Sequence, residues 1–276
     1  MNSQVKTKEE LGLMRESGRI AAAILSETQK AAKPQVATED LNKLVEELII
    51  EYSKKLQEKE QKENKDSPWC EGEILRPAFL GESSGRNGEL YPAVICLSIN
   101  STVVHGVPSQ DRLKDGDILS LDLGVIYKGY YSDTAITVPV GNVSPEARRL
   151  IDVTKRALRQ GIKKVHPGNT IGDIGNTIQR WVESRGFQVV RDLCGHGIGK
   201  ELHEPPEVPN YGKRHTGEVL KEGMVIAIEP MVNAGSWEVI YGPDNQSFIT
   251  KDGSLSAHFE HTVAVTKEGC EVLTKI

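Results

Sequence analysis

Two aspartates in neighbouring apolar segments are the first residues of this sequence whose type and spacing could do chemistry. From Ser120 to Val138, leucine and valine alternate with Asp122 and other polar residues, as in a half-buried strand. A turn at Lys128-Gly129 predicts that a second strand returns alongside the first and carries Asp133. Two buried carboxylates this close would repel each other, so the pair indicates a divalent metal. Two solvent-facing aspartates on an ordinary hairpin are the alternative for this stretch alone.

Three further residues extend this set. His196 is flanked by glycines, which let a substrate or the backbone approach the imidazole closely. Glu229 ends an apolar run from Met224 to Met231, and Glu260 precedes another apolar strand. A single acidic residue in an apolar strand is costly to bury unless it is paired or bound to a metal.

Four carboxylates and one imidazole form a ligand set for two divalent ions. Two ions of this kind can activate a water molecule and polarise a carbonyl or phosphoryl group. Hard oxygen donors with one nitrogen suit manganese, iron, cobalt or zinc better than copper. The alternative is that each acid is a separate salt-bridge partner.

Composition limits the class of protein. The chain has 276 residues and a formal net charge of −5, which argues against general nucleic-acid binding. It shows no signal peptide and no run of eighteen apolar residues. Its four scattered cysteines resemble free thiols in a reducing compartment. We therefore expect a soluble, cytoplasmic globular protein without a membrane anchor.

Helices and groups of strands alternate along the chain. Helical periodicity predicts one helix over about 8–30, a second capped by Thr38, a third starting at Ser144-Pro145-Glu146 and a fourth over 171–184. The charged run 54–66 is expected to be a solvated helix end that leads into a loop, and 67–91 an irregular loop. Strands are expected at 93–100, 102–105, 117–138, 224–231, 237–241, 247–250 and 257–265.

An internal repeat is suggested by aligning Pro34 with Pro167, which superposes Asp40 on Asp173. The same offset matches apolar positions of the second and fourth helices, although helical periodicity alone can align such positions by chance. We therefore predict an α+β fold with pseudo-twofold symmetry, in one catalytic domain over 1–276. Its related halves are about 1–140 and 141–276, with a variable charged and glycine-rich insertion at about 54–90. The site would lie between the halves.

Taken together, these residues and their contexts resemble the methionine aminopeptidases of type I over essentially the whole chain. The matching segments are Ser98-Ile99-Asn100, His105-Gly106-Val107-Pro108, Asp117 to Gly124, Ser132-Asp133-Thr134-Ala135, Gly195 to His203 and Ile228-Glu229-Pro230-Met231. The resemblance implies the pita-bread fold, a curved antiparallel sheet flanked by two helix pairs. It also implies removal of the initiator methionine from nascent polypeptides.

The resemblance assigns roles to the candidate residues. Asp133 and Glu260 would bridge two divalent ions, Asp122 would chelate one ion, and His196 with Glu229 would complete the other. A hydroxide between the ions would attack the first peptide bond, with Glu229 as proton acceptor. The resemblance also places His203 near the substrate carbonyl or oxyanion and His105 near the scissile amide. His166, His215, His258 and His261 receive no role, because no motif contains them.

Selection of methionine would need an apolar pocket with thiol or aromatic contacts. By position, the expected lining residues are Phe79, Tyr91, Cys96 and Leu202. The sequence departs from the family at residues 82–90, which are longer than usual and lack a tyrosine after Gly81. It departs again at Leu193 and Gln246, where aromatic residues are frequent in the family. These changes affect the expected pocket and its lid.

Three other functions compete with this interpretation. Relatives that cleave before proline or split dipeptides carry a further amino-terminal domain, for which 276 residues leave no room. A catalytically silent relative that binds protein or RNA would lack metal ligands, and a two-metal phosphoesterase would need basic residues around its site. The expected partners are the N-terminal peptides of nascent proteins, with transient ribosome contact. We expect a monomer with no nucleic-acid substrate and no membrane partner.

Overall fold

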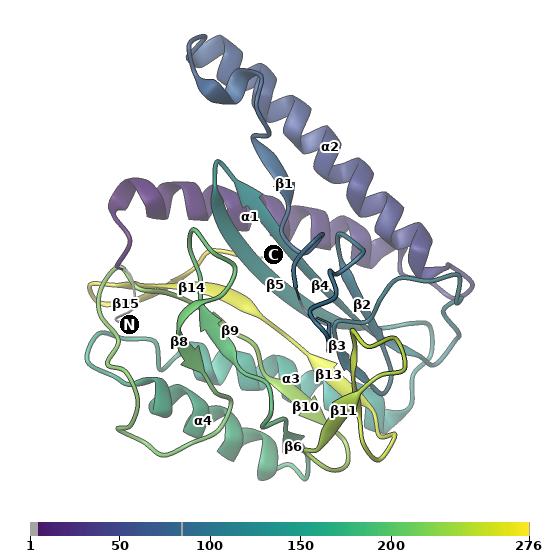
Figure 1. The fold of residues 1–276 in the computed structure, drawn as a ribbon. Helices are drawn as coiled ribbons and strands as arrows, with labels where there is room; N and C mark the ends of the chain where they lie inside the picture. The colour runs from purple at the N-terminus through teal and green to yellow at the C-terminus, as the bar shows by residue number, and fades with distance from the viewer. Residues whose placement is uncertain (1–4, 84, 276) are drawn as a thin grey trace.

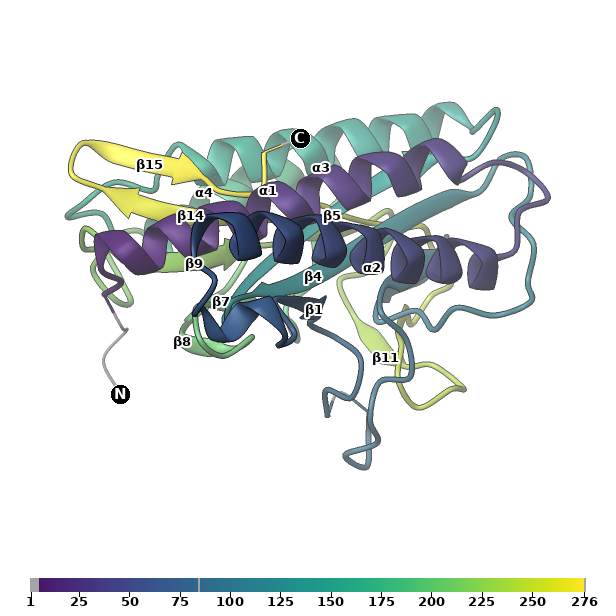
Figure 2. The same cartoon turned by 90° about the horizontal axis from the view of Figure 1, so that it is seen from above.

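The computed structural model describes residues 5–83 and 85–275, and four α-helices in this part of the chain gather on one side of the strands (Figure 2). They are α1 (Lys8–Ala31), α2 (Thr38–Glu63), α3 (Pro145–Ile162) and α4 (Ile171–Glu183). The helices pack in pairs, α1 with α2 and α3 with α4. This arrangement agrees with the two helix pairs that the family resemblance implies.

The predicted aspartate hairpin is the longest strand pair. It consists of β4 (Ile118–Tyr127) and β5 (Tyr130–Pro139), with Gly124 opposite Asp133. Lys128 and Gly129 both have positive φ, at 47° and 81°, which forms the tight turn that was predicted there. On either side of β4 lie β1 (Leu75–Pro77) and β2 (Cys96–Ile99), and α1 packs across β4 and β5.

The remaining strands form three more antiparallel sheets (Figure 1). The largest contains β15 (Gly269–Val272), β14 (His261–Thr266), β9 (Val225–Ile228), β7 (Gly195–Gly197) and β8 (Glu204–Val208), in that order. A second contains β13 (Ser256–His258), β10 (Met231–Asn233) and β6 (Gln188–Val189). A third contains β11 (Val239–Tyr241), β12 (Phe248–Thr250) and β3 (Thr102–Val104). Helices segregated from antiparallel sheets confirm the α+β prediction.

The start of α2 differs from the prediction. The cap residue is Ala37, and the Thr38 side chain makes no capping bond. Instead, the Thr38 hydroxyl donates to the Ser109 carbonyl oxygen at 3.0 Å and accepts from the Ser109 amide at 2.8 Å. The prediction was wrong because a distant loop, absent from any local pattern, takes the hydroxyl.

The charged run and the loop after it are more ordered than predicted. Helix α2 continues to Glu63, since Lys, Glu and Gln are good helix formers and Lys55 pairs with Glu51 one turn away. Residues 67–91 include a short 3₁₀ helix (Pro68–Cys70) and β1. At the other end of the insertion, the strand predicted from residue 93 begins only at Cys96.

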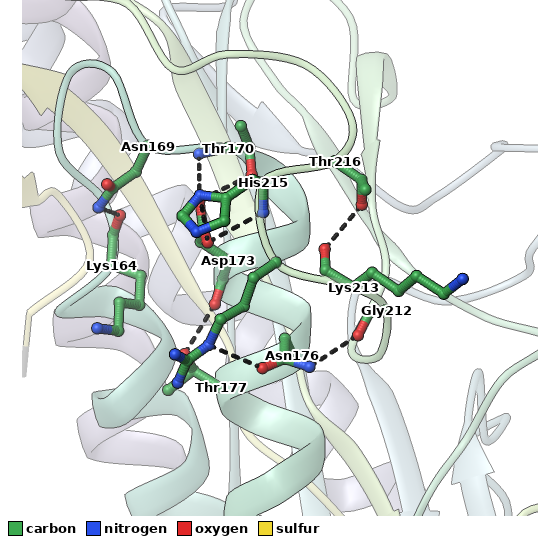
Figure 3. A network of polar contacts seen from close by, with 11 residues as sticks. Lys164, Asn169, Thr170, Asp173, Asn176, Thr177, Gly212, Lys213, His215 and Thr216 are labelled. Atoms are coloured by element: carbon green, nitrogen blue, oxygen red, sulfur yellow. Dashed lines mark hydrogen bonds and ion pairs between the residues drawn. The ribbon is translucent and has the colours of Figure 1, made fainter.

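The second helix pair begins as predicted. The Ser144 hydroxyl accepts the Ala147 amide at the start of α3. At α4, the Asp173 carboxylate accepts the backbone amide of Thr170 and also that of His215, which ties the helix start to the loop of residues 212–216 (Figure 3). The start of α4 is therefore bonded both to the residue that precedes it and to this loop.

The proposed duplication stays a prediction. Both aligned stripes are buried, comprising Leu41, Val45 and Ile49 in α2 and Ile174, Ile178 and Val182 in α4. Burial of one stripe per helix is expected of any amphipathic helix, so it does not test the relation between the halves. None of the helices in the described residues combines the length and apolarity that a membrane span requires.

Candidate active site

Hydrogen bonds between β5 and β14 bring Asp133 and Glu260 together. The Asp133 amide donates to the Thr262 hydroxyl at 2.9 Å, and that hydroxyl donates to the Asp133 carbonyl oxygen at 2.8 Å. Two residues further on, the Glu260 amide donates to the Ala135 carbonyl oxygen at 2.8 Å. The strand predicted over 257–265 is interrupted at Phe259 and Glu260, between β13 and β14. This break leaves Glu260 buried between strands of two sheets.

All the predicted site residues line one cavity of about 270 Å³. These residues are Phe79, Tyr91, Cys96, His105, Asp122, Asp133, His196, Leu202, His203, Glu229 and Glu260. Glu82 and Ser83, from the loop of residues 82–90, also line it, although neither was predicted as a site residue. Residues far apart in sequence, such as Phe79 and His203, which are 124 positions apart, therefore share one pocket.

The donor atoms gather in two groups that could each hold an ion. Asp133, His196 and Glu260 offer ligand atoms within 4.8 Å of one another, and so do Glu229, His258 and Glu260. Glu260 belongs to both groups, as a bridging carboxylate would. Asp122 belongs to neither, although its carboxyl lines the same cavity.

The carboxylates lack the partners that buried charges need. One oxygen each of Asp122, Asp133 and Glu260 is buried without a hydrogen bond to any described residue. Burial, with repulsion from Glu229, raises the pKa of Asp133 to about 7, and burial raises the pKa of Glu229 to about 8. The pKa values of Asp122 and Glu260 are also raised well above normal, first by burial and then by neighbouring carboxylates. Divalent cations would fit this donor set, because they supply the missing positive charge.

His196 is oriented for use of its Nε2 atom. Its Nδ1 lies 2.9 Å from the Gly197 carbonyl oxygen, and a carbonyl only accepts, so Nδ1 carries the proton. Nε2 therefore keeps its lone pair, 3.8 Å from Glu229 Oε1. Burial lowers the pKa of His196 to about 3, which keeps the ring neutral as metal ligation requires.

The two other predicted histidines lie at the wall of the cavity. The His203 ring is 4.5 Å from the His196 ring, measured between centroids. His105 has a positive φ of 57°, follows β3, and stands edge-on to Phe248 at 5.9 Å. Burial lowers the pKa of His105 to about 4, and its Nδ1 has no hydrogen-bond partner among the described residues.

His258 belongs to the site and was missed. It is 1% exposed, and its Nε2 lies 3.3 Å from Glu229 Oε2 without the alignment of a hydrogen bond. Its position two residues before Glu260 in the predicted strand over 257–265 was the available signal, because alternate residues of a strand share a face.

An apolar wall adjoins the donor atoms. Phe79, Tyr91, Cys96 and Leu202 are all buried in one hydrophobic cluster. The Tyr91 hydroxyl donates to the Gly106 carbonyl oxygen at 2.8 Å, which holds its ring in place. Gly124 makes room for Phe79, since an added Cβ there would lie 2.8 Å from the phenyl ring.

The loop of residues 82–90 is bonded to residues 245 and 246. The Arg86 amide donates to the Asn245 carbonyl oxygen at 2.8 Å, and the Gln246 side chain donates to the Leu90 carbonyl oxygen at 3.3 Å. Gln246 is buried, and Leu193 packs at the edge of a separate apolar cluster. Ser84 of this loop lies outside the described residues.

Comparison with known proteins agrees with the site. Residues 12–267 match the model of Metallopeptidase family M24. Methionine aminopeptidase 1 of Bacillus subtilis is 42% identical over 271 residues, which are 98% of each chain. The chain belongs to metallopeptidase family M24, among the methionine aminopeptidases. Within this family, the methionine aminopeptidase of Clostridium acetobutylicum is 44% identical, again over 98% of both chains.

Solved structures of M24 proteins extend the similarity to the fold. The methionine aminopeptidase of Thermotoga maritima is 40% identical over the full length of both chains, with a TM-score of 0.87. That of Rickettsia prowazekii also has a TM-score of 0.87, at 38% identity over 99% of this chain and all of that one. A prolidase from Pyrococcus horikoshii shares only the fold, at 23% identity and a TM-score of 0.70. The predicted pita-bread fold and metallopeptidase class are confirmed.

Proposed function

We propose that this M24 enzyme removes the N-terminal methionine from polypeptides, using two divalent metal ions. One observation carries the proposal, namely that every residue predicted for this chemistry lines a single cavity. The metal ligands would be Asp122, Asp133, His196, Glu229 and Glu260. Their unpartnered buried oxygens and raised pKa values support this assignment.

The ions themselves would be cobalt, manganese, iron or zinc, all of which accept mixed oxygen and nitrogen donors. When bound, such ions polarise the scissile carbonyl and make water a stronger nucleophile at neutral pH. Glu260 would hold both ions, since it lies in both groups of donor atoms, and the family resemblance gives Asp133 the same role. Asp122 would hold one, and His196 with Glu229 the other.

The chain's own residues would handle protons and position the substrate. Glu229 would accept the proton of the attacking water, as the resemblance implies, because its carboxylate lines the cavity in which the peptide bond would lie. His203 would hydrogen-bond the carbonyl oxygen as negative charge develops on it, and His105 would contact the scissile amide. The methionine side chain would pack against the apolar wall formed by Phe79, Tyr91, Cys96 and Leu202. The polarisable sulfur of Cys96 would contact it there.

The cellular setting follows from the substrate. An initiator methionine is accessible as soon as a polypeptide leaves the ribosome, so we infer transient ribosome contact and action in the cytoplasm. The substrate is the N-terminal peptide, and a monomer would suffice because one chain supplies every proposed ligand. We propose neither a nucleic-acid substrate nor a membrane partner.

The test is metal-dependent hydrolysis of two peptides, Met-Ala-Ser and Ala-Pro-Ala. Protein stripped with a chelator would be supplied with manganese, iron, cobalt or zinc in turn, beside an Asp133→Ala variant. We expect methionine release from the first peptide alone. In the variant, the rate of release should fall by about a hundredfold or more, because a bridging ligand is removed and even the residues that support metal ligands contribute about tenfold to a hundredfold. Cleavage before proline would instead indicate the related peptidase class, and no turnover with any ion would overturn the proposal.

A further inference from the structure

Part of the cavity lining is exposed at the surface of the molecule. Among its lining residues, Ser83 and His203 are exposed, while Glu82 is half-buried beside them. The proposed metal ligands and the apolar wall lie deeper, with Glu260 only 2% exposed and Tyr91 only 2%. An enzyme that removes the first residue must bind that residue inside, so the following residues leave past the exposed part of the lining, where Glu82, Ser83 and His203 lie.

Glu82 is held at this rim by its backbone. The Gly81 amide donates to the Tyr91 carbonyl oxygen at 2.9 Å, and the Tyr91 amide donates to the Glu82 carbonyl oxygen at 2.8 Å. Tyr91 is itself fixed through its hydroxyl to Gly106. The far end of the loop is tied to Asn245 through Arg86. The carboxylate of Glu82 is therefore presented from a fixed base rather than from a free loop.

The charge of Glu82 is not cancelled locally. Five carboxylates and no lysine or arginine line the cavity among the described residues. Two divalent ions would balance the four inner carboxylates, which leaves Glu82 as the remaining negative charge. Its side chain has no ion pair or hydrogen bond in the described part of the chain.

The surroundings of Tyr131 show which charges lie near this rim. Burial raises the pKa of the Tyr131 hydroxyl, Glu82 and Glu201 raise it further, and Arg76 lowers it. Two negative charges and one positive charge thus act on the same hydroxyl. Acidic side chains therefore outnumber basic ones among the charges that act on this hydroxyl.

We propose that Glu82 makes this enzyme favour substrates with a lysine or arginine as the second residue after the methionine over those with aspartate or glutamate there. The inference rests on the proposed function, since it concerns the peptide that leaves the same cavity. An exposed pair of opposite charges changes binding only modestly, and a repelled charge adds a similar effect of opposite sign. We expect about a fivefold difference in kcat/KM between the two kinds of peptide at low salt, carried mainly by KM.

The experiment compares three amidated peptides, Met-Ala-Lys, Met-Ala-Ser and Met-Ala-Glu, with the metal-loaded enzyme. The ratio of kcat/KM for the lysine and glutamate peptides would be measured at low salt and at about 0.5 M salt, where screening shortens the reach of the charge. Glu82→Gln removes the charge and keeps the size, whereas Glu82→Lys inverts it. Glu89→Gln is the matched control, because Glu89 is an exposed acid of the same loop that does not line the cavity.

The proposal expects the ratio to approach one in Glu82→Gln, to fall below one in Glu82→Lys and to stay unchanged in Glu89→Gln. In the unmodified enzyme, added salt should reduce the ratio, a result that does not depend on any variant folding. A ratio near one at low salt would overturn the inference while Met-Ala-Ser turnover still supported the proposed function. Equal loss for all three peptides in Glu82→Gln would place Glu82 on the shared α-amino group and would also overturn it. Absence of Met-Ala-Ser turnover would overturn both the inference on Glu82 and the proposed function.

Discussion

Each carboxylate in the cavity is unfavourable by itself. Asp122, Asp133 and Glu260 have buried oxygens without partners, and burial raises the pKa of Glu229 to about 8. A fold that only needed stability would replace such residues with apolar ones of similar size. Their cost is understandable if bound cations neutralise them. These individual residues therefore support the metal proposal.

His258 gives the first prediction at this scale. Its Nε2 lies 3.3 Å from Glu229 Oε2, so the ring would help to position the carboxylate of this proposed ligand. We expect His258→Ala to weaken manganese binding about tenfold to a hundredfold, the usual effect of losing a residue that orients a metal ligand. Calorimetric titration of the stripped protein would measure it.

The control for this prediction is His166→Ala, because His166 is exposed and does not line the cavity. Thermal unfolding of both variants would show whether the native fold persists. Manganese affinity that is equal in the two folded variants would contradict a role for His258.

At the scale of elements, the turn between β7 and β8 is held by an ion pair. Lys6 Nζ lies 2.5 Å from Glu204 Oε2, and both side chains are buried. The other oxygen of Glu204 accepts the amides of Lys200 and Glu201, at 2.8 and 3.3 Å. The turn thus fixed carries Leu202 and His203, so the N-terminal segment supports the cavity from outside.

Loss of Lys6 should therefore weaken both the fold and the site. Removing one partner of a buried pair leaves a buried charge, and we expect Lys6→Met to lower the free energy of unfolding by about 3 kcal/mol. Urea unfolding of the metal-loaded protein would measure this value. Lys200→Met is the control, since the Lys200 side chain is exposed and pairs only loosely with Glu10, at 3.6 Å. A change no larger than that of the control would show that the pair contributes little.

At the scale of the whole molecule, the proposed ligands come from β4, β5, β7, the end of β9 and the segment before β14. The unfolded chain cannot hold these residues together, so bound ions would stabilise only the native state. The gain is about 2.7 kcal/mol when the free metal concentration is 100 times the dissociation constant. Metal binding would in this way join the sheet that contains β4 and β5 to the sheet that contains β7, β9 and β14.

Metal removal should accordingly lower the melting temperature. We expect a chelator to reduce the Tm of the metal-loaded protein and added manganese to restore it, because binding and folding are coupled. Differential scanning calorimetry would measure both changes. In Asp133→Ala the chelator should have a much smaller effect, since one bridging ligand is absent. An equal shift in the variant would argue that the stabilising ions bind elsewhere.

Much of the architecture could be predicted from local patterns. The β4–β5 hairpin was predicted because alternation and a Lys-Gly turn are encoded within twenty residues, Ser120 to Val138. The start of α3 followed from Ser144 and Pro145 in the same way. The family was also predictable, because its motifs are short segments that can be read directly from the sequence. The comparisons confirm the family.

The errors share a physical cause. Thr38 matched a helix cap, but its hydroxyl is used by Ser109, which is 71 residues away. His258 matched no motif, yet its ring lies beside Glu229 in the folded chain. Local sequence records which conformations a segment prefers, and it does not record which distant group will compete for a side chain.

The sequence by itself therefore determined the kinds of element, the aspartate hairpin, the family and the set of residues suited to bind metal. Tertiary structure decided which of these residues meet in one cavity, that Glu82 stands at its rim and that Lys6 reaches Glu204 across 198 positions. The reason is that periodicity and turn chemistry act between near neighbours in the chain. Contacts between remote residues depend on how the sheets and helices pack, which only the folded chain defines.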